Sequence, residues 1–296
     1  MLKKIRDFLV LVKFEHTLFA LPFAYLGMVL AAATPWEAAR WVTWHEFVWI
    51  TVAMVAARTV AMGTNRLADR VIDARNPRTA QRPLVTGRVA PATAWGGTLV
   101  ALGVLTVAAW QLGPLPLRLL PGAVLFLVGY SFTKRFTWLS HFILGFTDGL
   151  APLGAWVAVR GSLFALTDVP AWFLLAAVTT WIGGFDLIYA CQDVAFDQRA
   201  GLYALPARFG IAAALRWSAI SHVLTVCFLV GMGVWLTLGW PYWLGLVGVA
   251  GLLGYEHYLV RPDDLSRIDV AFFNINSYIS VTLLVSVVAT LVLGGG

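Results

Sequence analysis

Nine segments of the chain are long and apolar enough to cross a lipid bilayer as helices. One span needs about 20 mainly apolar residues, and short polar or Gly- and Pro-containing connections separate these segments. Hydrophobic residues make up 60% of the chain and charged residues only 12%, against about 25% charged in soluble domains. The sequence predicts an all-α integral membrane protein with nine transmembrane helices in a single bundle, and one domain over residues 1–296. The predicted spans are 14–33, 44–64, 92–112, 115–133, 140–159, 169–191, 212–236, 240–259 and 273–293.

The positively charged residues are distributed unevenly among the connections between these spans. All but four of the 21 Lys and Arg residues lie in the N-terminal segment or in every second connection, the exceptions being Arg40, Arg58, Arg118 and Arg160. Short loops rich in Lys and Arg stay in the cytoplasm. We therefore expect a cytoplasmic N-terminus, an outside C-terminus and, without organelle targeting, a bacterial plasma membrane surrounded by membrane lipid. Charges divided among loops make no basic face for nucleic acid, so no nucleic-acid partner is expected.

Two Asp-rich segments occur at the ends of predicted helices. Asn65, Asp69 and Asp73 recur every four residues, and Asp193 and Asp197 repeat that spacing 124 residues later. A spacing of four residues places side chains on one face of a helix. Each segment leads into a basic loop that contains proline. The pattern predicts an internal repeat in which the second and sixth spans face each other.

Two carboxylate clusters without His or Cys favour a hard cation that binds oxygen, such as Mg²⁺. Mg²⁺ completes its shell with waters and phosphate oxygens, so the clusters indicate a diphosphate ligand held at the cytoplasmic face. Asp186 lies seven residues before Asp193, on the same helical face and deeper in the bilayer. Ordinary salt bridges at the membrane surface also place Asp and Arg four residues apart. Two clusters at one face, with a further carboxylate inside the bilayer, favour the functional interpretation.

Positive side chains near these carboxylates are candidates for contacting the phosphates. Arg66, Arg70 and Arg78 belong to the first Asp-rich segment and its loop, while Tyr130 and Lys134 end the fourth span. Together they offer positive charge and a hydroxyl donor. For Lys134 the alternative is that a basic residue after a span only anchors the topology.

Arg58 lies inside the second span, two turns deeper than Arg66. Asp148 is expected at a similar depth in the fifth span, so the two side chains are candidates for an ion pair. The alternative is that Arg58 binds the carboxylate of a benzoate-like acceptor, because guanidinium and carboxylate match in a bidentate geometry. The sequence leaves both interpretations open.

Three motifs, in this order, carry a resemblance to a known family. NRLADRVID begins at Asn65, YSFTK runs from Tyr130 to Lys134, and DLIYACQDVAFD contains both Asp186 and Asp197. The chain resembles the UbiA-type membrane prenyltransferases over nearly its whole length, which implies a nine-helix bundle with a cytoplasmic cap. It departs from many members in having Arg66 where they have Asp. The segments KFEHTLFALPFAY and GFDLIYACQD look like the branch that prenylates 4-hydroxybenzoate or related quinone precursors.

The resemblance implies transfer of a polyprenyl group from its diphosphate to an aromatic acid acceptor, with release of pyrophosphate. It implies that Mg²⁺ is held by Asp69, Asp73, Asp193 and Asp197. Asn65 would complete or orient that site, and Asp186 would support the metal or remove the ring proton. Neutralisation of the diphosphate would fall to Arg66, Arg70, Tyr130 and Lys134.

Three other functions were weighed against this one. A hydroxynaphthoate acceptor of menaquinone biosynthesis is the main rival within the family. A transporter or lipid carrier would also have repeats and intramembrane charges, but it has no need of two Asp segments spaced for metal at one face. A CDP-alcohol phosphotransferase needs a DGxxAR start, and Asp148-Gly149 is not followed by Ala-Arg.

Overall fold

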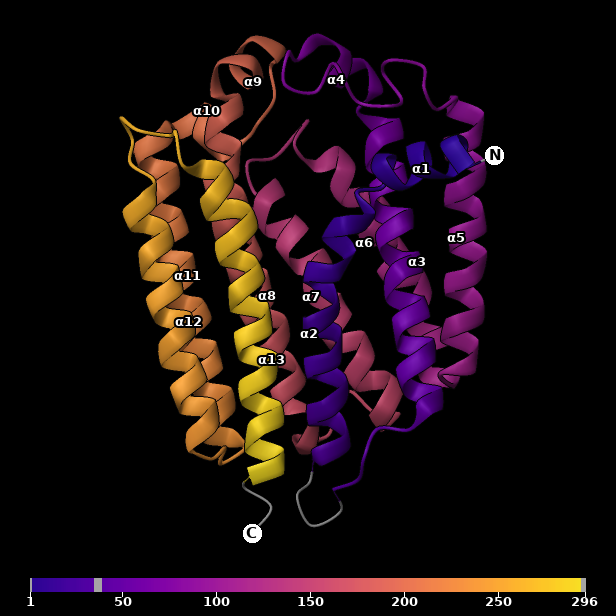
Figure 1. The fold of residues 1–296 in the computed structure, drawn as a ribbon, viewed down its shortest axis with the longest axis vertical. Coiled ribbons are helices and arrows are strands. Elements are labelled where there is room, and N and C mark those ends of the chain that lie inside the picture. Colours follow the sequence, from indigo (N-terminus) through magenta and orange to yellow (C-terminus); the bar gives the residue numbers. More distant parts are fainter. Residues whose placement is uncertain (1, 35–38, 294–296) are drawn as a thin grey trace.

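The computed structural model describes residues 2–34 and 39–293 as an assembly of helices without a named strand (Figure 1). The only extended pairing among these residues is an isolated bridge between Arg261 and Asp264. The long helices are α2 (Phe14–Ala33), α3 (Trp44–Ala68), α5 (Pro91–Gln111), α6 (Pro114–Thr133), α7 (Ser140–Arg160), α8 (Val169–Ala190), α11 (Ile211–Trp235), α12 (Trp240–Leu259) and α13 (Asn276–Leu293). The short elements are α1 (Leu2–Leu11), α4 (Arg70–Arg75), η2 (Leu166–Asp168), η3 (Cys191–Asp193), α9 (Val194–Ala200), α10 (Leu205–Phe209) and the π-helix η4 (Val270–Ile275).

Each of the nine predicted spans coincides with one of the long helices, to within a few residues at the ends. By length and composition, seven helical segments among the described residues could cross a membrane. Helix α12 is not among the seven, and α2 contributes only the shorter apolar stretch Leu21–Ala33. The all-helical prediction and the membrane-spanning character are confirmed, and the count of nine spans stays a prediction.

Local sequence explains where the long helices begin and end. Helices α5, α6, α8 and α12 each have proline in their first two positions, where its missing N–H group costs no hydrogen bond. Helix α3 begins with a capping box, in which Thr43 Oγ1 accepts from the backbone N–H of Glu46 at 3.2 Å. Helix α7 ends at Gly161, whose φ of 67° suits glycine.

The long helices pack side by side (Figure 1), and the contact between α7 and α8 is the most extensive. At this crossing Gly145 of α7 lies against α8, and a Cβ atom there would stand 2.2 Å from the carbonyl oxygen of Thr179. The largest buried apolar cluster includes Leu174, Val178 and Trp181 of α8, together with residues of α2, α7 and α11–α13. This side of the bundle therefore forms a close-packed wall.

The two Asp-rich segments lie at the same end of the bundle, here called the motif end, where α3 and α8 terminate. Helices α4, α9 and α10 cross this end, and α1 lies beside it (Figure 1). The short elements thus form a cap over the motif end, and they position the polar side chains that face inward.

Candidate active site

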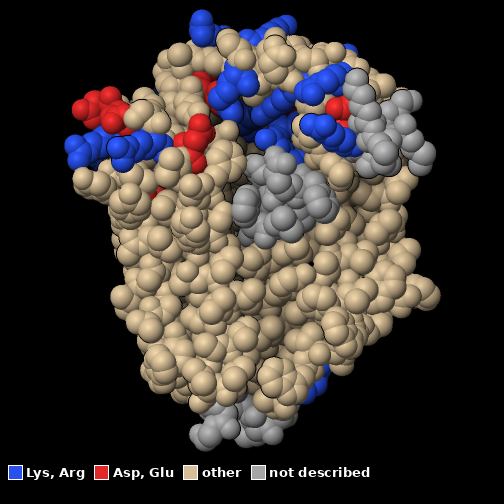
Figure 2. All heavy atoms as spheres, viewed as in Figure 1, with Lys and Arg blue, Asp and Glu red and all other residues tan. Residues whose placement is uncertain are grey.

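A cavity of about 760 Å³ opens at the motif end, between the cap and the long helices. Its polar lining comprises Arg58, Asn65, Arg66, Asp73, Asn76, Arg78, Arg82, Tyr130, Lys134, His141, Asp148, Asp186, Tyr189, Asp193 and Asp197, among others. On the face that Figure 2 shows, Lys and Arg gather at the motif end, and the sides of the bundle carry almost no charge. The distribution fits an anionic ligand at one end of an apolar body.

The first Asp-rich segment does not remain one continuous helix. Helix α3 ends at Ala68 and α4 begins at Arg70, so Asp69 stands between them with φ −92° and ψ 4°. The backbone N–H of Asp69 still donates to the Asn65 carbonyl at 2.9 Å, and that of Asp73 donates to the Asp69 carbonyl at 2.7 Å. The four-residue spacing thus continues through the break, and the shared helical face stays a prediction. Asp69 is 1% exposed and lies outside the cavity lining.

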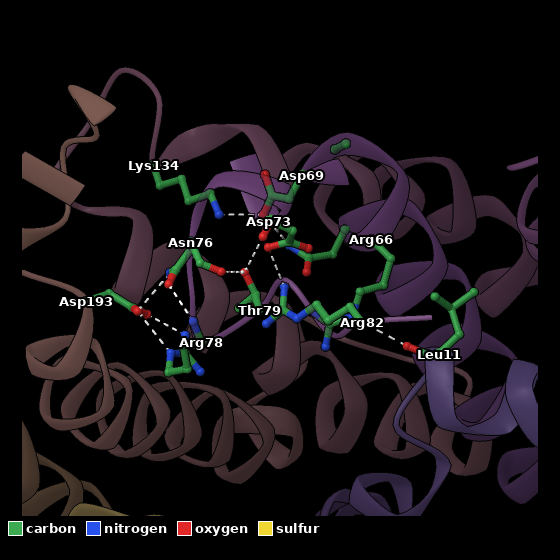
Figure 3. Close-up of polar contacts among 12 residues, drawn as sticks. Leu11, Arg66, Asp69, Asp73, Asn76, Arg78, Thr79, Arg82, Lys134 and Asp193 are labelled. Atoms are coloured by element: carbon green, nitrogen blue, oxygen red, sulfur yellow. Dashed lines mark hydrogen bonds and ion pairs between the residues drawn. The ribbon is translucent and has the colours of Figure 1, made fainter. Parts of the chain in front are cut away.

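Asp69 is held by an amide and two cations. Asn65 Nδ2 donates to Asp69 Oδ2 at 3.4 Å, and Arg135 Nη2 lies 3.2 Å from Oδ1. Lys134 Nζ donates to Oδ2 (Figure 3). Lys134 itself lines the cavity, so this carboxylate is linked to the cavity through its partner.

Asp73 is buried but lines the cavity. Arg82 Nη1 donates to its Oδ1 at 2.6 Å, and Thr79 Oγ1 donates to its backbone carbonyl at 2.9 Å. These contacts hold the loop after α4 against the carboxylate (Figure 3). A cation therefore compensates this second carboxylate as well.

The second Asp-rich segment repeats the backbone of the first. Asp193 has φ −99° and ψ 3°, nearly the angles of Asp69, and it is the last residue of η3, directly before α9. Its Oδ1 accepts from Asn76 Nδ2 at 3.0 Å and from Arg78 Nε at 2.9 Å. Both partners come from the first segment's loop, 117 and 115 residues away (Figure 3). Asp197 follows on α9 and lines the same cavity.

The predicted phosphate-binding side chains fall into two groups. Arg66, Arg78, Tyr130 and Lys134 line the cavity, but Arg70 is exposed and outside the lining. Arg66 Nε donates to the Leu11 carbonyl at 3.4 Å, and Tyr130 Oη donates to the Ala61 carbonyl at 3.2 Å. These contacts fix the two side chains on the walls of the cavity.

Arg78 contacts both the second Asp-rich segment and an aromatic residue of α8. Its Nη1 donates to Tyr189 Oη at 2.9 Å, and its guanidinium lies 5.1 Å from the Tyr189 ring centroid. Burial alone would lower the pKa of Arg78, but the hydrogen bond with Asp193 and the nearby negative charges together raise it. The arginine therefore carries a permanent charge beside the carboxylate.

Deeper in the cavity, two further polar pairs meet. His141 Nδ1 lies 2.7 Å from Asp186 Oδ2, and the backbone N–H of Leu205 donates to His141 Nε2 at 3.3 Å. Since Nε2 accepts that bond, Nδ1 carries the proton that bonds Asp186. Arg58 Nη1 lies 3.5 Å from Asp148 Oδ1, so the predicted ion pair is present. That pair also borders an apolar cavity of about 170 Å³, and the apolar surroundings strengthen the attraction.

The carboxylates of the cavity are suited to Mg²⁺. Among the described residues, no three His, Cys, Asp or Glu side chains are close enough to form a metal group by themselves. Mg²⁺ does not need such a group, because it takes one or two carboxylates and completes its shell with waters and substrate phosphates. Asp73, Asp193 and Asp197 offer carboxylate oxygens to one cavity. The residues present therefore fit Mg²⁺ that arrives with a phosphate ligand.

The sequence interpretation missed several polar residues of this cavity. His141 is an isolated histidine at the start of α7, and Asn76 and Arg82 belong to a loop that was noted only for its charge. Their partners lie 9 to 117 residues away in sequence. No helical spacing marks such contacts, although the basic Pro-containing loop directly after the Asp-rich segment was a usable signal.

Comparison with known proteins gives consistent results. The sequence model of the UbiA prenyltransferase family matches residues 20–278. A 4-hydroxybenzoate octaprenyltransferase of Cupriavidus necator is 33% identical over 238 residues, which cover 77% of this chain and 79% of that protein. One of Methylobacillus flagellatus is 34% identical over 240 residues, covering 80% and 78%.

Solved structures share the fold. The apo structure of a UbiA homologue from Aeropyrum pernix K1 aligns with a TM-score of 0.83 and 29% identity, covering 94% of this chain and 98% of that one. A UbiA homologue from Archaeoglobus fulgidus bound to GPP and Mg²⁺ aligns with a TM-score of 0.61 and 18% identity, covering 94% and 99%.

Proposed function

Since the chain belongs to the UbiA prenyltransferase family, we propose that it transfers a polyprenyl group from an allylic polyprenyl diphosphate to the ring of 4-hydroxybenzoate in quinone biosynthesis, releasing pyrophosphate. The observation that carries this proposal is the meeting of two Asp-rich segments across one cavity, with cationic side chains bonded to their carboxylates. The names of the relatives supply the acceptor.

When bound, Mg²⁺ would stabilise the negative charge that develops on the leaving pyrophosphate. Asp73, Asp193 and Asp197 would hold the metal from the cavity lining. Asp69 would join them once Lys134 moves away from its carboxylate, and Asn65 would orient Asp69. The Mg²⁺-bound structure of the Archaeoglobus homologue supports this choice of metal.

The cations of the cavity would exchange partners when the diphosphate binds. Arg78, Arg82 and Lys134 now bond carboxylates. With those carboxylates engaged by metal, the same side chains are free to donate to phosphate oxygens, and Arg66 and Tyr130 add donors from the wall. Stabilised pyrophosphate leaves as the allylic C–O bond breaks, which creates an allyl cation.

The acceptor would bind deeper than the diphosphate. Arg58 presents a guanidinium to the cavity, where it can exchange Asp148 for the carboxylate of the acceptor. The electron-rich ring then attacks the allyl cation, and the ring proton passes to Asp186, which His141 holds in place. From the motif end inward, the cavity would thus bind first the diphosphate and then the acceptor.

We infer a single domain with nine membrane spans, a cytoplasmic N-terminus and a site at the cytoplasmic face of the plasma membrane. The concentration of Lys and Arg at the motif end supports this orientation. A cysteine introduced at Ser266, in the loop between α12 and α13, should react with an impermeant thiol reagent only after the inner face is opened.

The proposal is tested with purified protein, Mg²⁺, a polyprenyl diphosphate and a panel of acceptors. Formation of prenylated 4-hydroxybenzoate with an equal amount of pyrophosphate would support it. Preference for a hydroxynaphthoate would shift the assignment to menaquinone biosynthesis. A folded protein that gives neither product nor pyrophosphate with any acceptor would leave the lipid-carrier interpretation.

A further inference from the structure

Helix α13 is preceded by a π-helical turn, η4, that borders the cavity. Phe272 and Phe273 belong to this turn and line the cavity. A π-turn inserts one extra residue into the helical repeat, and such turns occur mostly at functional positions. The insertion changes which side chains the helix presents, so the orientation of both phenylalanines depends on the turn.

The two phenylalanines complete a continuous aromatic wall, made of Trp181, Phe185, Tyr189, Phe272 and Phe273. The Tyr189 and Phe272 rings stack, with centroids 4.2 Å apart and an angle of 29° between their planes. Phe185 meets Phe272 edge-on at 5.2 Å and Trp181 at 5.1 Å. All five side chains line the cavity. Because Tyr189 also bonds Arg78, the wall begins beside the proposed diphosphate site.

Asn276 bonds the π-turn directly. Its Nδ2 donates to the carbonyl oxygens of Ala271 at 3.3 Å and of Phe272 at 3.0 Å. Both carbonyls belong to the π-turn, so the amide ties the start of α13 to the turn. The side chain of Asn276 is 7% exposed.

Asn276 begins α13 and also lines the cavity. Its Oδ1 is buried and has no hydrogen-bond partner among the described residues, so the hydrogen bonds of this side chain go to the π-turn through Nδ2.

We propose that Asn276 is a positioning residue that holds the π-turn and thereby keeps Phe272 and Phe273 in the aromatic wall, where the wall shields the allyl cation from water. This proposal rests on the proposed prenyl transfer. Aromatic faces attract cations within about 6 Å. When the wall is intact, the cation is captured by the acceptor ring. When it is displaced, water adds to the cation, forms the C–O bond of a prenyl alcohol and loses a proton.

The test measures how each turnover ends. Prenylated acceptor, prenyl alcohol and pyrophosphate are quantified together for the wild type and for Asn276→Leu. We expect the alcohol share of released pyrophosphate to rise about threefold to tenfold in the variant. The KM for the diphosphate donor should stay near the wild-type value.

Controls separate positioning from general damage. Ser286→Ala changes a buried polar residue of the same α13, far from the turn, and should leave the ratio unchanged. Phe272→Leu removes one ring, leaves Asn276 in place, and should raise the alcohol share even if the Asn276 variant does not fold. An unchanged ratio in folded Asn276→Leu would overturn the proposal, as would an unchanged ratio in folded Phe272→Leu. Absence of product from the wild type would instead refute the transfer itself.

Discussion

Arg78 and Asp193 join the two Asp-rich segments, with Nε of the arginine 2.9 Å from Oδ1 of the carboxylate across 115 residues of sequence. A second contact between Nη2 and Oδ2 makes the pair bidentate. This geometry is the one in which guanidinium binds carboxylate or phosphate most strongly. When a diphosphate enters with metal, the phosphate oxygens can therefore replace Asp193 as the partner of Arg78, and the metal can replace Arg78 as the partner of Asp193.

Replacing Arg78 with Met should weaken binding of the diphosphate donor. Loss of one charge-assisted contact raises the donor KM about tenfold to a hundredfold, with a smaller fall in kcat. Steady-state kinetics at saturating acceptor measures both. Arg75→Met, in the exposed part of α4, is the matched control and should change little.

The exposed position of Arg70 leads to a separate expectation. Because Arg70 lies outside the cavity lining, Arg70→Met should leave the donor KM within about twofold of the wild type. A rise as large as that of Arg78→Met would show that Arg70 contacts the diphosphate, as the sequence interpretation has it.

Variants of the Arg58–Asp148 pair distinguish a role in acceptor binding from a role in stability. Arg58→Leu should raise the KM for 4-hydroxybenzoate about tenfold or more by removing the carboxylate partner, and it should also lower thermal stability by leaving Asp148 unpaired. The double variant Arg58→Leu/Asp148→Leu should recover stability, because an apolar pair replaces an ionic one, but not the KM. Recovery of the KM together with stability would assign Arg58 a structural role only.

The crossing of α7 and α8 should tolerate no side chain at Gly145. Gly145→Ala places a methyl group against the Thr179 carbonyl at 2.2 Å, and relief of that overlap costs about 1–3 kcal/mol. Thermal unfolding in detergent should show a lower midpoint. Gly154→Ala on the same helix meets no atom within 4 Å, so an equal loss there would contradict the packing argument.

Helix positions were predictable because bilayer thickness fixes the length of an apolar span. Proline and glycine at the helix ends then set the boundaries, as at Pro91 and Gly161. The place of Asp186 inside the cavity was predictable for the same reason, since α8 continues as a regular helix through it. These features depend on local sequence.

The cap was less predictable because its geometry depends on long-range contacts. The break at Asp69 is accompanied by contacts to Lys134 and Arg135, which lie in the turn directly after α6. Nothing in the spacing of the Asp-rich segment distinguishes a broken helix from a continuous one. The partners of His141 and Asn76 were hidden for the same reason, as each is brought near its carboxylate by the folding of distant segments.

The most direct test of the account is Mg²⁺-dependent prenyl transfer by the wild type, Asp73→Asn and Asp193→Asn, with product and pyrophosphate followed in the same reactions. The account predicts one pyrophosphate for each prenylated 4-hydroxybenzoate, loss of both on chelation of the metal, and a fall of at least about a hundredfold in each folded variant. Transfer that survives chelation, or variants that keep the wild-type rate, would contradict the assignment of the Asp-rich cavity as the active site.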